Sequence, residues 1–145
     1  VATMDPGTII SNKVYGAVDP SGFIFAIASS SMFITWMKTV GGRLKSDISF
    51  SSTITWNNFP LPDLDETTKK RIADAGKKVL IARAEFPDRS LAQLYSARIM
   101  EPKLIKAHDA LDREVDKAFG APRKLTTERQ RQELLFSNYA KLTNN

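Results

Sequence analysis

The first sixty residues combine two short alternating patterns with one long apolar run. Polar and apolar or β-branched residues alternate over residues 8–14 and 48–56, which is the spacing of half-buried strands. Between them, a turn cluster at residues 19–22 precedes the apolar run at residues 23–40, and Gly41 and Gly42 follow it. The pattern predicts a small block of two strands around one helix.

Beyond the Phe-Pro-Leu-Pro stretch at residues 59–62, every long pattern is helical. Asp65 has the chemistry of a helix start, and apolar residues then recur at helical spacing. Pro102 opens a second amphipathic pattern, and Thr126 or Thr127 caps a third. Three such helices with short connections predict an antiparallel bundle.

Together the two patterns predict an α+β protein in two parts. Residues 1–62 would form the small block of strands and helix, and residues 63–145 an antiparallel bundle of about three helices. A chain of 145 residues can bury a modest core without disulfides. It contains no cysteine, which excludes a thiolate metal site and favours a reducing, intracellular compartment.

Charge and hydropathy narrow the classes of partner. Three serines at residues 29–31, together with Thr35 and Lys38, interrupt the apolar run. Its apolar stretches are therefore shorter than the roughly 18 to 20 residues that a membrane span requires, and we expect no contact with a membrane. The net charge of +5 favours an anionic partner without identifying it.

The sequence offers no recognisable catalytic or metal-binding motif. It has no phosphate-binding glycine loop, no nucleophile elbow and no cluster with metal-ligand spacing, so we expect no catalytic residue here. The single histidine, His108, lies on the apolar stripe of its predicted helix, which favours a packed, hydrogen-bonded role over that of ligand or base. Carboxylates on the same helix alternate with Arg113 and Lys117, and we interpret them as a solvated face. These carboxylates are Asp109, Asp112, Glu114 and Asp116.

Residues 41–52 have the chemistry of a nucleic-acid contact. Glycines permit a close approach to phosphate, and cationic and hydroxyl side chains bind phosphate oxygens. The candidate backbone contacts are Lys38, Gly42, Arg43, Ser46, Ser49 and Ser51. Lys45 and Asp47 would point the same way on an extended chain, which suits the guanine and the cytosine of one G·C pair. A surface salt bridge between these two residues is the alternative interpretation.

Four blocks of the sequence, in order, resemble the MmeI-like, type IIL restriction and modification enzymes. The blocks are SSSMFITWM at residues 29–37, GRLKSD at 42–47, TWNNFPLP at 55–62 and AHDALDREVDKAFG at 107–120. The resemblance implies that residues 1–62 are the last part of a DNA target-recognition domain and that residues 63–145 are a helical C-terminal domain. It also implies that Lys45 and Asp47 read one base pair of the recognition site.

The resemblance further implies a longer parent chain. That chain would carry an adenine-N6 methyltransferase that uses S-adenosylmethionine, and a nuclease that would use Mg²⁺. The family's Asn-Pro-Pro-Tyr/Phe methyltransferase motif is absent from these residues, so we expect neither methylation nor cofactor binding by this part alone. The expected partners are double-stranded DNA and the N-terminal domains of the same chain, in a bacterial cytoplasm. The alternatives are a helical protein-interaction module of a restriction or phage-defence complex, and an independent enzyme.

Overall fold

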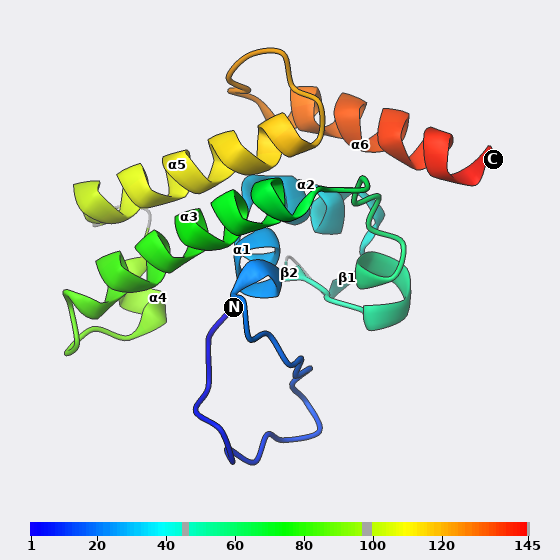
Figure 1. Ribbon diagram of the computed structural model, residues 1–145. Coiled ribbons are helices and arrows are strands. Elements are labelled where there is room, and N and C mark those ends of the chain that lie inside the picture. The colour runs from blue at the N-terminus through cyan, green and yellow to red at the C-terminus, as the bar shows by residue number, and fades with distance from the viewer. Residues whose placement is uncertain (45–46, 97–99, 145) are drawn as a thin grey trace.

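The computed structural model describes residues 1–44, 47–96 and 100–144, and over these residues the protein is helical (Figure 1). The helices are α1 (Phe23–Ala28), α2 (Ser31–Val40), the π-helix η1 (Ser52–Trp56), α3 (Glu66–Ala84), α4 (Leu91–Leu94), α5 (Pro102–Ala118) and α6 (Glu128–Thr143). The β-structure of the described residues is limited to two paired two-residue strands, β1 (Arg43–Leu44) and β2 (Asp47–Ile48). The fold class is therefore all-α, and the α+β prediction is wrong.

The alternating pattern at residues 8–14 does not form a strand. Residues 1–18 are an exposed, irregular arm that extends away from the helices as an open loop (Figure 1), and Ile9 within it is 98% exposed. A strand is stabilised by cross-strand partners, and none of the described strands pairs with this arm. Alternation alone therefore predicted a strand for which the fold provides no neighbour.

The second predicted strand, residues 48–56, is mostly a helical turn. Ile48 pairs with β1, but the chain then winds into η1. Ser51 Oγ accepts a hydrogen bond from the Ile54 N–H at 3.2 Å, and the Thr55 hydroxyl donates back to the Ser51 carbonyl. Such local side-chain bonds to the backbone compete with a β-ladder, and a count of polar and apolar positions does not detect them.

The single helix predicted over residues 23–40 is two helices, because Ser30 satisfies the backbone on both sides of a break. Ser30 has an extended backbone, and its Oγ accepts from the Phe33 N–H at 3.3 Å at the start of α2. The same hydroxyl donates to the Ile27 carbonyl at 2.7 Å at the end of α1. A serine in this position is a strong N-cap, so the Ser30 hydroxyl pairs one backbone group on each side of the change of direction.

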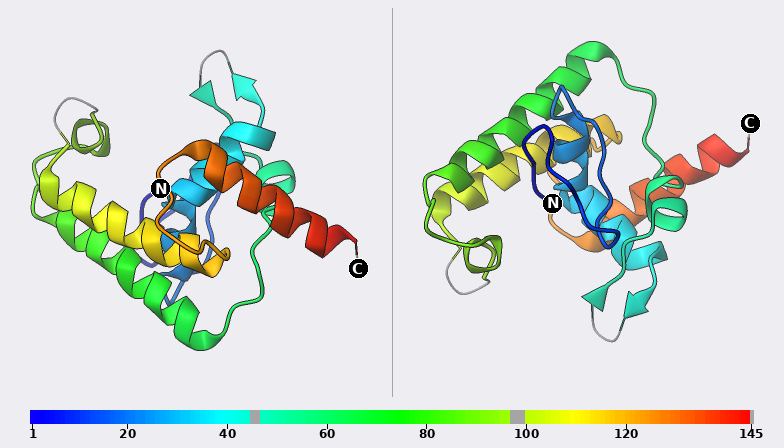
Figure 2. Two further views of the ribbon diagram at one scale, coloured as in Figure 1. Left: turned by 90° about the horizontal axis from the view of Figure 1, so that it is seen from above. Right: turned by 90° about the horizontal axis from the view of Figure 1, so that it is seen from below.

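In the second half of the sequence, the residues predicted to begin helices do so. Asp65 caps α3 by accepting a hydrogen bond from the Thr68 N–H at 2.7 Å. Thr127 caps α6, and Gln130 completes a capping box with it. α3 and α5 lie side by side as an antiparallel pair, whereas α6 packs chiefly against α2 (Figures 1 and 2).

One hydrophobic core joins the two parts of the chain. It is built from buried side chains of α1 and α2, which include Phe25, Ile27, Met32, Phe33 and Trp36, and of the later helices, which include Ile72, Val79, Leu104, Leu111, Val115 and Leu135. α1 and α3 approach closely at Gly76, where an added Cβ would lie 2.6 Å from the Cβ of Ala26. The core therefore continues from one side of residue 62 to the other.

A buried ion pair fixes α6 to α5. Arg131 Nε and Nη2 donate to the two carboxylate oxygens of Asp116 at 2.9 Å and 2.8 Å, and both side chains are buried. Burial raises the pKa of the Asp116 carboxyl, while the hydrogen bonds and positive charge of Arg131 oppose this shift. The interpretation of this helix's carboxylates as a solvated face is therefore wrong for Asp116, whose partner lies 15 residues away in the sequence.

We expect Arg131→Met to lower the free energy of unfolding by about 3 to 5 kcal/mol, because it leaves a buried carboxylate without its partner. Urea denaturation measures the change. Arg129→Met is the matched control, since Arg129 is 87% exposed and pairs with Glu133 at the surface. Its cost should stay below about 1 kcal/mol. Equal costs for the two variants would contradict the importance of the buried pair.

Candidate functional site: a hairpin supported by α2

The segment with the predicted nucleic-acid chemistry includes a short hairpin that projects from the helices (Figure 2). β1 and β2 pair antiparallel, with Arg43 opposite Ile48 and Leu44 opposite Asp47. The backbones of Arg43, a predicted phosphate contact, and Asp47, a predicted base contact, therefore belong to one two-stranded ladder. Their roles in DNA contact stay predictions.

Gly42 and Ser49 lie at the base of the hairpin. The Gly42 carbonyl accepts a hydrogen bond from the Ser49 N–H at 2.9 Å, and both residues are exposed. Lys45 and Ser46, which connect the two strands in the sequence, lie outside the described residues. The roles assigned to these four residues stay predictions.

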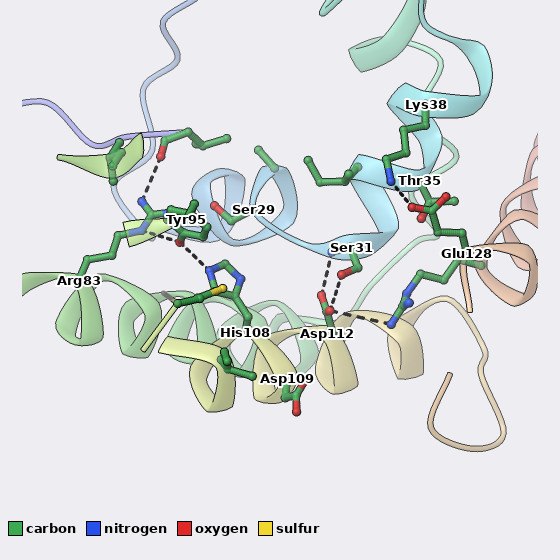
Figure 3. Close-up of a pocket in the computed structure, with 17 residues that line it drawn as sticks. Ser29, Ser31, Thr35, Lys38, Arg83, Tyr95, His108, Asp109, Asp112 and Glu128 are labelled. Carbon is green, nitrogen blue, oxygen red and sulfur yellow. Dashed lines mark hydrogen bonds and ion pairs between the residues drawn. The ribbon is translucent and has the colours of Figure 1, made fainter. Parts of the chain in front are cut away.

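The other two predicted phosphate contacts have partners within the protein. Lys38 forms an ion pair with Glu128 and points toward α6 (Figure 3). Ser51 caps η1 through its hydroxyl oxygen. Both side chains are partly accessible, so their contacts with phosphate also stay predictions.

α2 supports both ends of the hairpin. The chain enters β1 directly after α2, and the segment that leaves the hairpin returns to the same helix. Trp36 is buried in α2, and its Nε1 donates to the Thr55 carbonyl at 2.9 Å. Phe33 packs edge-to-face against Trp56 with ring centroids 5.3 Å apart, and its centroid is 6.4 Å from that of Phe50. The hairpin is thus fixed at both ends to one helix, although sequence reasoning had assigned no such role to Trp36.

A cavity of about 570 Å³ lies between the helices, next to the start of α2 (Figure 3). Arg83 Nε donates to Tyr95 Oη at 2.8 Å, and Tyr95 Oη lies 2.6 Å from His108 Nε2. Because Arg83 donates to the phenolic oxygen, the Tyr95 proton is directed toward His108, which fits a neutral imidazole. Burial lowers the pKa of His108, and the nearby charge of Arg83 lowers it further, while Asp112 opposes the shift. The predicted hydrogen-bonded role of His108 is confirmed.

Asp112 connects this cavity to the helix that supports the hairpin. Its Oδ1 accepts a hydrogen bond from the Ser31 N–H at 2.8 Å, and its Oδ2 accepts from the Ser31 hydroxyl. Asp112 is therefore a structural acceptor rather than part of a solvated face. Local spacing could not reveal this role, because 81 residues separate the two partners in the sequence.

Within the described residues, no three histidine or carboxylate side chains are grouped so that they could hold a metal ion. None of the helices there is both long and apolar enough to cross a membrane.

Comparisons with known proteins identify relatives along the whole chain. Residues 1–63 match the family model described as the MmeI target recognition domain, and residues 64–145 match that of the MmeI C-terminal domain. DNA methyltransferase A of Bacillus subtilis (strain 168) is 35% identical over 136 residues, which are 94% of this chain and 15% of that protein. The solved structure of the type IIL restriction-modification enzyme MmeI in complex with DNA matches with a TM-score of 0.81 and 39% identity. That match covers 86% of this chain and 16% of the MmeI chain, so this chain spans a small part of its relatives' length.

Gly41→Ala should loosen the base of the hairpin. An added Cβ would collide with the Met37 carbonyl oxygen and lie 3.1 Å from the Ser49 carbonyl oxygen. We expect the free energy of unfolding to fall by about 1 to 3 kcal/mol, and the Ser49 N–H to exchange faster with solvent. Gly42→Ala is the control, because an added Cβ there meets nothing within 4 Å. Urea denaturation and amide exchange measure both variants, and the same exchange rate in both would contradict tight packing at Gly41.

The lowered pKa of His108 should make stability depend on pH. Its folded-state pKa lies below the ordinary value of 6.5, so the unfolded chain binds the proton first as the pH falls below that value. The free energy of unfolding should therefore decrease as the pH is lowered from about 7 to about 5.5. His108→Gln should remove this part of the decrease, which urea denaturation at several pH values measures. His108 is the only histidine, so an unchanged decrease in the variant would overturn this assignment.

Proposed function

Because the chain belongs to the MmeI family, with a target recognition domain over residues 1–63 and a C-terminal domain over residues 64–145, we propose that it recognises DNA sequence for a longer adenine-N6 methyltransferase. The observation that carries this proposal is the projecting hairpin, which lies inside the part that matches the target recognition model. A hairpin whose two ends are fixed to one helix has a defined position relative to the rest of the protein, as base readout requires.

The hairpin suits the major groove of DNA. That groove is about 12 Å wide and admits a two-stranded ribbon. The Lys45 ammonium would donate to guanine O6 and N7, and the Asp47 carboxylate would accept from the amino group of the paired cytosine. Gly42, Arg43 and Ser49 would hold the adjacent phosphates. A relative solved in complex with DNA and the net charge of +5 support this assignment.

Methylation would be carried out by other domains of the parent chain. Those domains would bind S-adenosylmethionine, and a nuclease domain would use Mg²⁺. The relative named DNA methyltransferase A and the restriction-modification enzyme MmeI support this part of the proposal, and this chain corresponds to 15% and 16% of their lengths. The partners of the present chain would be double-stranded DNA and those domains, in the bacterial cytoplasm where the DNA is located.

A helical docking module is the second candidate function. α6 carries exposed apolar side chains, with Phe136 52% and Leu142 54% exposed. Exposed apolar surface of this kind occurs where proteins bind each other. In that case the helices would hold a protein of a restriction or phage-defence complex, and substitution of Lys45 would change nothing in DNA selection.

Selection from random duplex DNA distinguishes the two functions. The parent protein, as wild type and as Lys45→Ala, is mixed with a random duplex pool over a salt series, and the bound DNA is sequenced. For the wild type we expect one recovered motif and a DNA affinity that falls steeply with salt concentration. The Lys45→Ala variant should lose its preference at one base pair of that motif, which corresponds to about 1 to 3 kcal/mol of discrimination. Asp47→Ala should relax the same base pair.

Lys78→Ala is the control for charge alone. Lys78 belongs to α3, which lies on the other side of the molecule from the hairpin (Figure 2). The Lys78→Ala variant should leave the recovered motif unchanged. If Lys45→Ala and Asp47→Ala also leave the motif unchanged, the hairpin does not read the sequence and the docking function is favoured.

A further inference from the structure

The start of α2 is held by a carboxylate from a helix far along the chain. Asp112 of α5 accepts two hydrogen bonds from Ser31, one from its N–H and one from its hydroxyl. The Asp112 side chain is only 17% exposed, so water competes weakly for these bonds. A negative charge at this end of α2 is also favoured by the helix dipole. The first residue of α2 is therefore tied to α5 by both its backbone and its side chain.

Asp112 is itself held in place by the buried ion pair. Arg131 Nη2 lies 3.9 Å from the Asp112 carboxylate and 2.8 Å from that of Asp116, which lies one turn further along α5. The guanidinium of α6 thus contacts both carboxylates of α5. The order Ser31, Asp112, Arg131, Asp116 forms a continuous polar chain through three helices.

α6 also holds the other end of α2. Gln132 Nε2 donates to Thr39 Oγ1 at 3.1 Å, and Glu128 pairs with Lys38. The contacts at both ends of α2 therefore join the part that matches the target recognition domain to the part that matches the C-terminal domain.

The orientation of α2 determines where the hairpin lies. α2 has ten residues, which corresponds to a length of about 15 Å, and the hairpin follows directly after its last turn. A rotation of about 4° at the start of α2 would displace its far end by about 1 Å. Hydrogen bonds to base edges tolerate only a few tenths of an ångström, whereas contacts with phosphates by flexible cations tolerate more.

We propose that Asp112, fixed by Arg131, is a positioning residue for sequence recognition: its bonds to Ser31 set the orientation of α2 and thereby that of the hairpin on DNA. The effect on base discrimination rests on the proposed function, whereas the effect on the hairpin itself does not. The C-terminal helices thereby contribute to specificity without contacting the bases that the hairpin reads.

The test uses the parent protein with Asp112→Ala and, as a milder change, Ser31→Ala, which keeps the charge of Asp112. Amide exchange of the Ser49 N–H without DNA reports the hairpin, and selection from random duplex DNA reports discrimination. We expect faster Ser49 exchange and about tenfold weaker discrimination at the base pair that Lys45→Ala relaxes. Affinity for a duplex without the recovered motif should stay within about twofold, because that binding depends on phosphates.

Asp109→Ala is the matched control on the same helix. Asp109 is exposed and its ion pair with Lys124 is long, at 4.0 Å, so this variant should change neither readout. The Asp112→Ala and Ser31→Ala effects should also be less than additive in the double variant, because Asp112→Ala already removes the Ser31 hydroxyl bond that Ser31→Ala removes. If Asp112→Ala fails to fold, Ser31→Ala alone decides the result.

The results separate this inference from the proposed function. If Lys45→Ala relaxes a base pair but Ser31→Ala and Asp112→Ala change neither readout, the positioning role is overturned and the function stands. If Asp112→Ala and Ser31→Ala lose affinity equally for all duplexes, the positioning role is also overturned. That result would mean that Asp112 supports the whole fold and not base discrimination in particular. If Lys45→Ala relaxes nothing, the proposed readout fails, and faster Ser49 exchange in Ser31→Ala then decides whether Asp112 positions the hairpin.

Discussion

A buried guanidinium requires anionic partners, and the helix arrangement in this protein provides them for Arg131. Moving an arginine out of water costs several kcal/mol unless carboxylates with good geometry surround it. Arg131 meets this need through Asp116, at 2.8 Å, and Asp112, at 3.9 Å, and this fixes how α6 lies against α5. Because Asp112 also binds the start of α2, the same charge helps to fix the helix that supports the hairpin.

Much of the helical half could be predicted from the sequence, because its signals are local. Asp65, Pro102 and Thr127 act within one helical turn of their own position, and each begins a helix as expected. The predicted strands failed for a related reason: alternation records polarity but neither a missing partner strand nor a capping bond such as that of Ser51. The break at Ser30 was not predicted, because polarity alone does not distinguish a serine within a helix from a serine that caps one.

The candidate site was only partly accessible to sequence reasoning. The chemistry of residues 41–52 and the resemblance to a family indicated a DNA contact, and the structure shows that two of the positions belong to one ladder. The contacts that hold this ladder in place could not be predicted, because their partners lie far apart in the sequence. Trp36 and Thr55 are 19 residues apart, and Ser31 and Asp112 are 81 residues apart. Contacts of that range follow from packing, which a pattern along the chain does not record.

The close approach of Gly76 to Ala26 has a consequence for how such chains diversify. These residues lie in segments that match different family models, yet an added Cβ at Gly76 would lie 2.6 Å from that of Ala26. A recombination event that joined α1 of one lineage to α3 of another would succeed only where both retain small residues at this crossing. The two segments should therefore be inherited together.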